Sequence, residues 1–183
     1  MTPLMKESVS PAKSALLYGC IFGILMILQL VILYNLQLDP LQYSWVGIII
    51  NLCNFIIFPF TLLILGCIAF RKRNGGYLSV SQCLKNGLII TLTGAILYCI
   101  FYAIFVNAVP GYIESSVAQT RIVRLHNEPN IKADKLAAFL EDSRKGMQPG
   151  ITIPMVMIVY TFIGMIGSFI VGSFLRREKP VTA

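Results

Sequence analysis

A chain of 183 residues that is 56% hydrophobic and only 13% charged does not have the composition of a soluble domain. Soluble domains carry about 25% charged residues, and half that share leaves too little polar surface to face water. The net charge of +7 does not indicate nucleic-acid binding, because nine of the 15 basic residues flank long apolar segments. We therefore expect lipid to cover much of the chain.

The charged residues are distributed so that four long segments contain none of them. These segments separate Lys13 from Asp39, Asp39 from Arg71, Lys85 from Glu114, and Lys145 from Arg176. Each exceeds the ~20 residues that an α-helix needs to cross a hydrocarbon core of ~30 Å. A transmembrane β-barrel would show alternating segments of about ten residues, which are absent from the sequence.

The sequence therefore predicts an all-α, polytopic membrane protein with one membrane domain over residues 1–183. We expect the four transmembrane helices at residues 14–38, 45–70, 82–109 and 151–175. The first is predicted to be retained, because it is longer than a signal-peptide core and no cleavage site follows it. The polar segment 112–149 is predicted to be helical, with Leu136, Phe139 and Leu140 at helical spacing and Gly146 at its end.

The basic residues near the ends of the spans predict the orientation. With four spans they fall on one side: Lys6, Lys13, Arg71, Lys72, Arg73, Lys85, Arg176, Arg177 and Lys179. Basic and acidic residues nearly cancel in segment 112–149. The positive-inside rule then places both termini in the cytoplasm and segment 112–149 outside it.

Residues typical of metal, cofactor or catalytic sites do not cluster in this sequence. The five cysteines form no C-x-x-C pair, and His126 is the only histidine. We therefore expect no metal, no cofactor and no disulfide scaffold, with the cysteines as small apolar packing residues. No ionisable residue lies within a span, which disfavours an ion pump. The acids of segment 112–149 resemble a solvated surface, so we expect no enzyme.

Uncharged polar residues form a layer at similar depth in the expected spans. Gln29, Asn54 and Tyr98 belong to three different helices, Asn51 lies one turn from Asn54, and Tyr160 is close in depth. They predict either a polar cavity or hydrogen bonds between helices, and the second is the commoner use of such residues. Pro59 is expected to bend the second span just below this layer.

Small residues at four-residue spacing predict close packing of helices. They form three stripes: Gly19 and Gly23; Gly87, Thr91 and Ala95; and Gly164, Ser168 and Gly172. Most such stripes serve the protein's own bundle. The sequence leaves open whether each stripe packs within the chain or binds another membrane protein or a second copy of this chain, and the stripe of the last span is the best candidate for binding another subunit.

The loop after the second span contains Arg71, Lys72, Arg73, Gly75 and Gly76. It lacks the spacing of a phosphate-binding P-loop and follows no strand. We interpret it as a cluster that sets membrane orientation and contacts anionic lipid.

This loop also carries a resemblance to a known family. The run Arg71-x-x-x-Gly75-Gly76-Tyr77-x-Ser79-x-x-Gln82-x-x-Lys85-x-Gly87 resembles Domain of Unknown Function 4199, as do Lys13, Tyr18 and Gly19 in the first span. The likeness extends over about residues 13–175. It implies four helices and a bacterial inner-membrane location, and it implies no activity.

Two functions are compatible with these observations. The small-residue stripes and the lack of catalytic residues favour a non-enzymatic subunit or scaffold that associates with other membrane proteins. The polar layer favours the alternative, a small carrier or flippase-like protein for a lipid-linked or neutral solute.

Overall fold

The structure is a computed structural model, and it describes residues 11–177. These residues form seven α-helices and one π-helical turn, and they include no β-strand. In chain order the elements are α1 Pro11–Leu36, α2 Ser44–Leu52, η1 Cys53–Ile57, α3 Phe58–Arg73, α4 Val80–Ala108, α5 Tyr112–Asn127, α6 Ala133–Gly146 and α7 Pro149–Leu175. Lys6 and Lys179, two of the basic residues that predict the membrane orientation, lie outside the described residues.

Four helical segments are long and apolar enough to cross a membrane: α1, the continuous run α2–η1–α3, α4 and α7. The predicted all-α fold with four membrane-spanning helices is therefore confirmed. Their bounds differ from the predicted ones by a few residues. The second helix continues to Arg73 through the basic cluster, and α7 begins at Pro149, where proline is favoured in the first turn of a helix.

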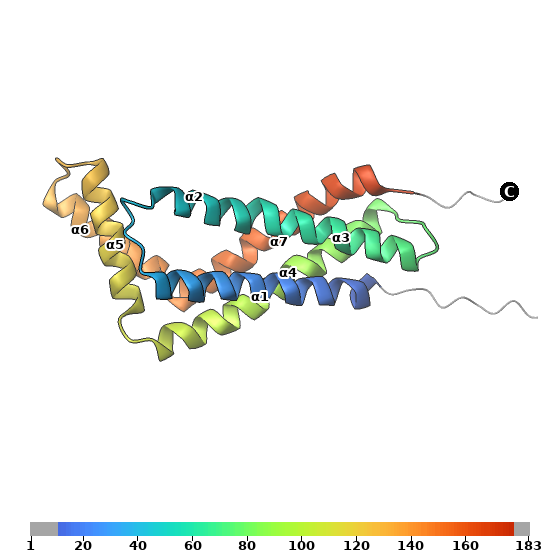
Figure 1. The fold of residues 1–183 in the computed structure, drawn as a ribbon, viewed down its shortest axis with the longest axis horizontal. Helices are drawn as coiled ribbons and strands as arrows, with labels where there is room; N and C mark the ends of the chain where they lie inside the picture. The colour runs from blue at the N-terminus through green and yellow to red at the C-terminus, as the bar shows by residue number, and fades with distance from the viewer. Residues whose placement is uncertain (1–10, 178–183) are drawn as a thin grey trace, which may run out of the picture.

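Helix α4 lies at the centre of the bundle, packed between α1 and α7, with α3 beside all three (Figure 1). Phe22, Leu63 and Ile90, from α1, α3 and α4, are fully buried in the core. The outward faces are apolar as well, and Phe169 and Phe174 of α7 are 63% and 85% exposed. A soluble protein of this size rarely exposes such a continuous apolar surface, whereas lipid is its natural solvent.

The predicted small-residue stripes are buried where α1 and α7 approach α4. A β-carbon on Gly19 or Gly23 would lie 2.6 Å from that of Thr93 or 2.8 Å from that of Leu97, both on α4. On α7, a β-carbon at Gly164 would meet Thr91, and one at Gly172 would lie 3.1 Å from that of Cys83. Ser168 of α7 contacts α4 as well, because its side chain is fully buried next to Gly87.

The α7 stripe, the best candidate in the sequence for binding another subunit, makes its contacts within the chain. Gly164, Ser168 and Gly172 face α4 of the same chain, which has its own small residues at Gly87 and Thr91. Two stripes of small residues allow two helix backbones to approach closely and gain dispersion contacts, in the absence of a hydrophobic driving force within lipid.

A tight connection joins α3 to α4 at one end of the bundle, which we call the basic end because it carries Lys13, Arg71, Lys72, Arg73, Lys85, Arg176 and Arg177. Gly75 and Gly76 both have positive φ angles, of 68° and 88°, which favour glycine. Ser79 then caps α4 in a reciprocal capping box with Gln82.

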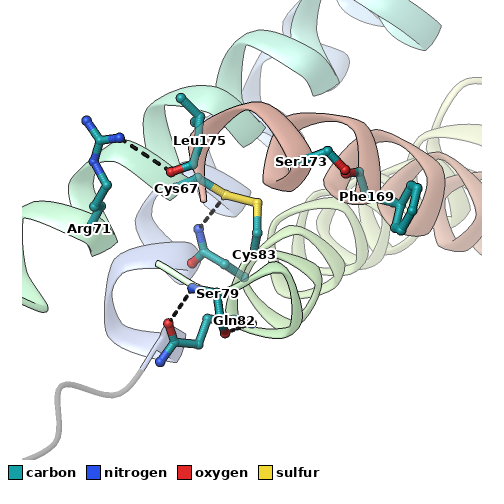
Figure 2. Close-up of a disulfide and its surroundings, with 9 residues drawn as sticks. Cys67, Arg71, Ser79, Gln82, Cys83, Phe169, Ser173 and Leu175 are labelled. Carbon is teal, nitrogen blue, oxygen red and sulfur yellow. Dashed lines mark hydrogen bonds between the residues drawn. A yellow bond between two sulfur atoms is a disulfide. The ribbon is translucent and has the colours of Figure 1, made fainter. Parts of the chain in front are cut away.

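The chain segment after α7 is fastened to this connection. Leu78 and Arg177 exchange two backbone hydrogen bonds, of 2.9 and 2.8 Å. The guanidinium of Arg71 donates to the carbonyl of Leu175 at 3.4 Å (Figure 2), and that of Arg73 donates to the hydroxyl of Ser14 at 3.4 Å. Part of the basic cluster therefore holds helix ends together.

Cys67 of α3 and Cys83 of α4 form a disulfide at the basic end (Figure 2). Both residues are fully buried, and the side-chain amide of Asn86 donates to the Cys67 sulfur at 3.8 Å. The expectation that all five cysteines are unpaired packing residues is wrong for these two. Sequence spacing does not show the pair, because the α3–α4 hairpin brings together two cysteines that are 16 residues apart. Cys20, Cys53 and Cys99 are free.

Helices α5 and α6 lie together across the opposite end of the bundle (Figure 1). An ion pair joins Glu114 of α5 to Arg144 of α6, and the Arg124 guanidinium lies 4.9 Å from the centre of the Phe139 ring. The Tyr102 hydroxyl of α4 donates to the carbonyl of Met147 at 2.6 Å. The helical character predicted for segment 112–149 thus corresponds to two helices that cap the bundle at this end, which we call the capped end.

Candidate intramembrane binding site

The regular α-helical pattern of the second span is interrupted halfway along its length. Residues Cys53–Ile57 form a π-helical turn, and Pro59 lies two residues after its end. Proline has no N–H to offer the carbonyl four residues earlier, at Phe55, so the regular α-helical ladder is interrupted at this point. Single π-helical turns of this kind occur frequently at functional sites.

The part of this span toward the capped end leaves the bundle. None of the residues of α2 is buried, whereas α3 buries Leu62, Leu63 and Phe70 among others. Figure 1 shows α2 set apart from α1 over this half, while α3 lies against the other helices. The second span therefore separates from the other helices on the side of the capped end, beyond the π-helical turn.

A cavity of about 300 Å³ lies where α2 leaves the bundle. Gln29, Asn51, Asn54 and Tyr98, the residues of the predicted polar layer, all line it, and Tyr160 does so as well. Met26, Leu30, Leu33, Phe55, Val156 and other apolar side chains make up the rest of the wall. The volume is at the lower end of the range for small-molecule sites, which are typically apolar with a few placed polar groups.

Two polar atoms in this wall are buried without a hydrogen-bond partner. They are the side-chain carbonyl oxygens Oε1 of Gln29 and Oδ1 of Asn54. A buried acceptor without a donor costs about 1–3 kcal/mol relative to a satisfied one. If either amide rotates toward the cavity, its oxygen can accept a hydrogen bond from a hydroxyl or amide donor of a bound molecule.

The cavity has a closed floor toward the basic end. The rings of Phe22 and Tyr160 meet edge to face with centroids 5.3 Å apart, and Phe22 covers Gly94 of α4. Below this level Gly164 and Ser168 hold α7 tightly on α4. The site is therefore a pocket that reaches partway into the membrane, not a channel through the bundle.

The polar groups of the wall are amides and phenols. Among the described residues that line the cavity there is no Asp, Glu, Lys, Arg or His. Amides and phenols can donate and accept hydrogen bonds, and they do not act as metal ligands of the usual kind. Across residues 11–177, no group of three or more His, Cys, Asp or Glu is placed to hold a metal ion.

The other residues singled out in the sequence do not join this site. Gly19, Gly23, Gly164, Ser168 and Gly172 form helix contacts, and the basic loop with Arg71, Lys72, Arg73, Gly75 and Gly76 lies at the other end of the bundle. The sequence did not predict the apolar wall of the cavity, because residues such as Met26 and Val156 cannot be told from lipid-facing residues by their type. Pro59 was the one sequence feature that indicated an irregularity in the second span near the cavity.

Comparison with known proteins gives a family and no activity. A family model described as "Protein of unknown function (DUF4199)" matches residues 17–177, which is most of the chain. No curated protein and no solved structure matched.

Proposed function

Since the chain belongs to the DUF4199 family of proteins of unknown function, we propose a function from its intramembrane cavity: it binds a neutral amphiphile within the bilayer. The proposed ligand has an apolar chain and at least one hydrogen-bond donor. This proposal develops the carrier-type alternative from the sequence, because the polar layer of Gln29, Asn51, Asn54 and Tyr98 lines a cavity.

The observation that carries the proposal is the pair of unpartnered oxygens of Gln29 and Asn54 in an otherwise apolar wall. Polar side chains that serve only to join helices would be expected to bond each other. A charged ligand is disfavoured, since no ionised side chain lines the cavity and a charge without a partner is costly at this depth.

Lipid has lateral access to the cavity. A shallow hollow of about 360 Å³ on the apolar surface between the second span and α7 is lined by Phe60, Phe162 and Ile163, among others, and it shares Phe55 and Val159 with the cavity. The outer surface along this route is apolar. A molecule dissolved in the membrane would therefore reach the site without passing through water.

The alternative of a subunit or scaffold is less well supported. Its main motivation was the set of small-residue stripes, and these are occupied by contacts within the chain. The apolar helices contact the bilayer, and we propose no further partner for them. The proposed role is non-enzymatic, since it needs only reversible binding.

The four long apolar helices indicate a multi-pass membrane protein. We place it in a bacterial cytoplasmic membrane, with the basic end in the cytoplasm by the positive-inside rule. The cavity then lies in the outer half of the bilayer.

Photolabelling in nanodiscs tests the proposal. The probe is a monoacylglycerol with a diazirine in its acyl chain, and labelled peptides identify the site. We expect labelling of α1, η1 and α7 residues of the cavity wall. Val156→Trp should abolish this labelling, because Val156 lines the cavity, whereas Ile158→Trp, on the lipid-facing side of the same helix, should preserve it.

A second variant tests the polar layer. Asn54→Leu should weaken probe binding by a factor of about three, as expected for one intramembrane hydrogen bond of ~0.6 kcal/mol. Labelling spread evenly over the lipid-facing residues of all four spans, and unchanged in Val156→Trp, would refute the proposed function.

A further inference from the structure

A second cavity adjoins the intramembrane one on the side of the capped end. It has a volume of about 380 Å³ and lies between the end of α1 and the first turns of α5. Leu30 and Leu33 line both cavities, so the two share a wall. The side chains that line only the second cavity are all polar: Tyr34, Gln37, Tyr112, Ser115, Ser116 and Gln119.

We propose that this second cavity binds the headgroup of the amphiphile whose chain occupies the first, and that it selects a neutral headgroup carrying hydroxyl groups. This inference rests on the proposed function. It adds the class of ligand and a separate set of residues that recognise it.

The arrangement matches an amphiphile in both polarity and direction. The apolar wall with its few amides lies at membrane depth, and the more polar wall lies at the membrane boundary, where α5 crosses the end of the bundle. A third hollow, between α5 and α6, shares Ser116 and Gln119 with the second cavity. It gives a larger headgroup room to extend toward water.

The charges around the second cavity disfavour an anionic headgroup. No ionised side chain lines it. None of the arginines of α5 and α6 lines it: Arg144 pairs with Glu114, and Arg124, which lines a hollow next to it, pairs with Glu128 at 3.0 Å while lying over Phe139. Phosphate recognition in proteins normally uses a free arginine or lysine, and neither faces this cavity.

The hydrogen-bonding groups favour a ligand that donates. The hydroxyls of Ser115 and Ser116 already donate to the carbonyl of Tyr112, each at 2.9 Å, so only their acceptor lone pairs remain. The unpartnered amide oxygens of Gln29 and Asn54 in the adjoining cavity are acceptors too. Hydroxyl groups of a ligand supply the missing donors, whereas an ester or a fully ionised phosphate has none.

Tyr112 is the part of the wall that can donate in return. A phenol is protonated at physiological pH even at its ordinary pKa, and burial raises the pKa of Tyr112 further. Its ring also packs edge to face on Tyr34 and Phe105, which fixes its position at the junction of α1, α4 and α5. A hydroxylated headgroup can both donate to the serines and accept from this phenol.

Competition against the photoactivatable monoacylglycerol tests the inference with the full chain in nanodiscs. Three competitors with the same acyl chain differ only in the headgroup: monoacylglycerol, the fatty-acid methyl ester, and lysophosphatidic acid. We expect monoacylglycerol to compete about tenfold better than the methyl ester, as two hydrogen bonds would provide. Lysophosphatidic acid should compete least, because its charge finds no partner.

Variants on α5 locate the selectivity. Gln119→Leu and Ser116→Ala should each reduce the preference for monoacylglycerol over the methyl ester by at least about threefold. Ala118→Leu, an exposed neighbour outside the cavity, should leave it unchanged. If Gln119→Leu does not fold, Ser116→Ala alone tests the headgroup site, because this substitution removes only one hydroxyl.

The outcomes separate this inference from the proposed function. Equal competition by monoacylglycerol and the methyl ester would overturn the headgroup site, and so would a preference that neither α5 variant changes. The intramembrane cavity would still be supported in either case, provided that labelling by the acyl-chain probe is lost in Val156→Trp. Strongest competition by lysophosphatidic acid would overturn the neutral class of headgroup. Absence of specific chain labelling would instead reject the proposed function itself.

Discussion

The Tyr160 hydroxyl of α7 donates a hydrogen bond of 3.4 Å to the backbone carbonyl of Asn54 in the π-helical turn. This bond gives a partner to a backbone group in the turn that precedes Pro59, where the regular helical pattern is interrupted. It also ties the bent span to α7 at the floor of the cavity. The bend that opens the bundle is therefore held in place by a residue of another helix.

Removal of this hydroxyl should loosen the bend. We expect Tyr160→Phe to lower the free energy of unfolding by about 0.6 kcal/mol and by no more than ~1.7, the range for intramembrane hydrogen bonds. Titration with sodium dodecyl sulfate, followed by circular dichroism, measures it. Tyr43→Phe, at an exposed position before α2, is the control and should have no effect. Equal stability of both variants would show that the bond contributes nothing.

The close approach of α1 to α4 predicts a strong effect at Gly94. A β-carbon there would collide with the buried ring of Phe22, so Gly94→Ala should cost about 1–3 kcal/mol through overpacking. The matched control is Gly47→Ala in α2, where a β-carbon has nothing within 4 Å and alanine should stabilise the helix by up to ~1 kcal/mol.

The same Gly94 variant should also affect the site. The Phe22 ring packs edge to face on Tyr160, which lines the cavity, so a displaced Phe22 ring should reduce probe labelling, whereas Gly47→Ala should not. The same detergent titration and photolabelling measure both effects. A Gly94→Ala protein as stable as the wild type would contradict the tight packing between these helices.

The disulfide between Cys67 and Cys83 predicts a thiol count. The unfolded, unreduced protein should react with three equivalents of maleimide, at Cys20, Cys53 and Cys99, and with five after reduction. Mass spectrometry gives both numbers directly. Five equivalents without reduction would show that the pair is present as thiols.

Loss of the same bond should affect stability. A cross-link over 16 residues contributes up to about 3 kcal/mol in the chain-entropy account, so a reducing agent should lower the unfolding free energy of the wild type. Cys67→Ala should be destabilised already and should show no further change on reduction. A wild type that is insensitive to reduction would contradict a stabilising role for the disulfide.

The four spans could be predicted from the sequence because the solvent imposes the pattern. A charge within hydrocarbon is costly, so the charge-free segments had to mark the spans. Depth along a straight helix follows from residue counting at ~1.5 Å per residue, and this count placed Gln29, Asn54 and Tyr98 at one level. Those three side chains line one cavity in the structure.

The sequence could not predict whether the polar layer lines a cavity or a closed contact between helices, because this depends on the course of the backbone of the second span. Pro59 predicts a bend and gives neither its direction nor the departure of α2 from α1. The outer cavity was missed for a related reason, since Ser115 and Gln119 are ordinary polar residues of an amphipathic helix until α5 is placed against α1.

The disulfide had a signal that depth counting could have used. Cys67 lies six residues before the end of α3 at Arg73, and Cys83 lies three residues after the start of α4 at Val80. In an antiparallel hairpin such positions lie at nearly the same height. Height alone does not determine which way each side chain points. Prediction of the disulfide would therefore also have needed the rotational orientation of both helices about their axes.

The orientation of the chain decides which leaflet supplies the ligand, and cysteine labelling can determine it. The test uses a protein in which Cys20, Cys53 and Cys99 are replaced by alanine and the disulfide is kept. A single cysteine is then introduced at Lys72, exposed at the basic end, or at Asn130, exposed between α5 and α6.

A membrane-impermeant maleimide should label Asn130→Cys in intact cells and Lys72→Cys only after permeabilisation, because the basic end is expected in the cytoplasm. The cavity would then draw its amphiphile from the outer leaflet. The reverse labelling would contradict the positive-inside argument and assign the same cavity to the inner leaflet. Because both cavities lie toward the capped end, the labelling pattern fixes the side on which the headgroup is recognised.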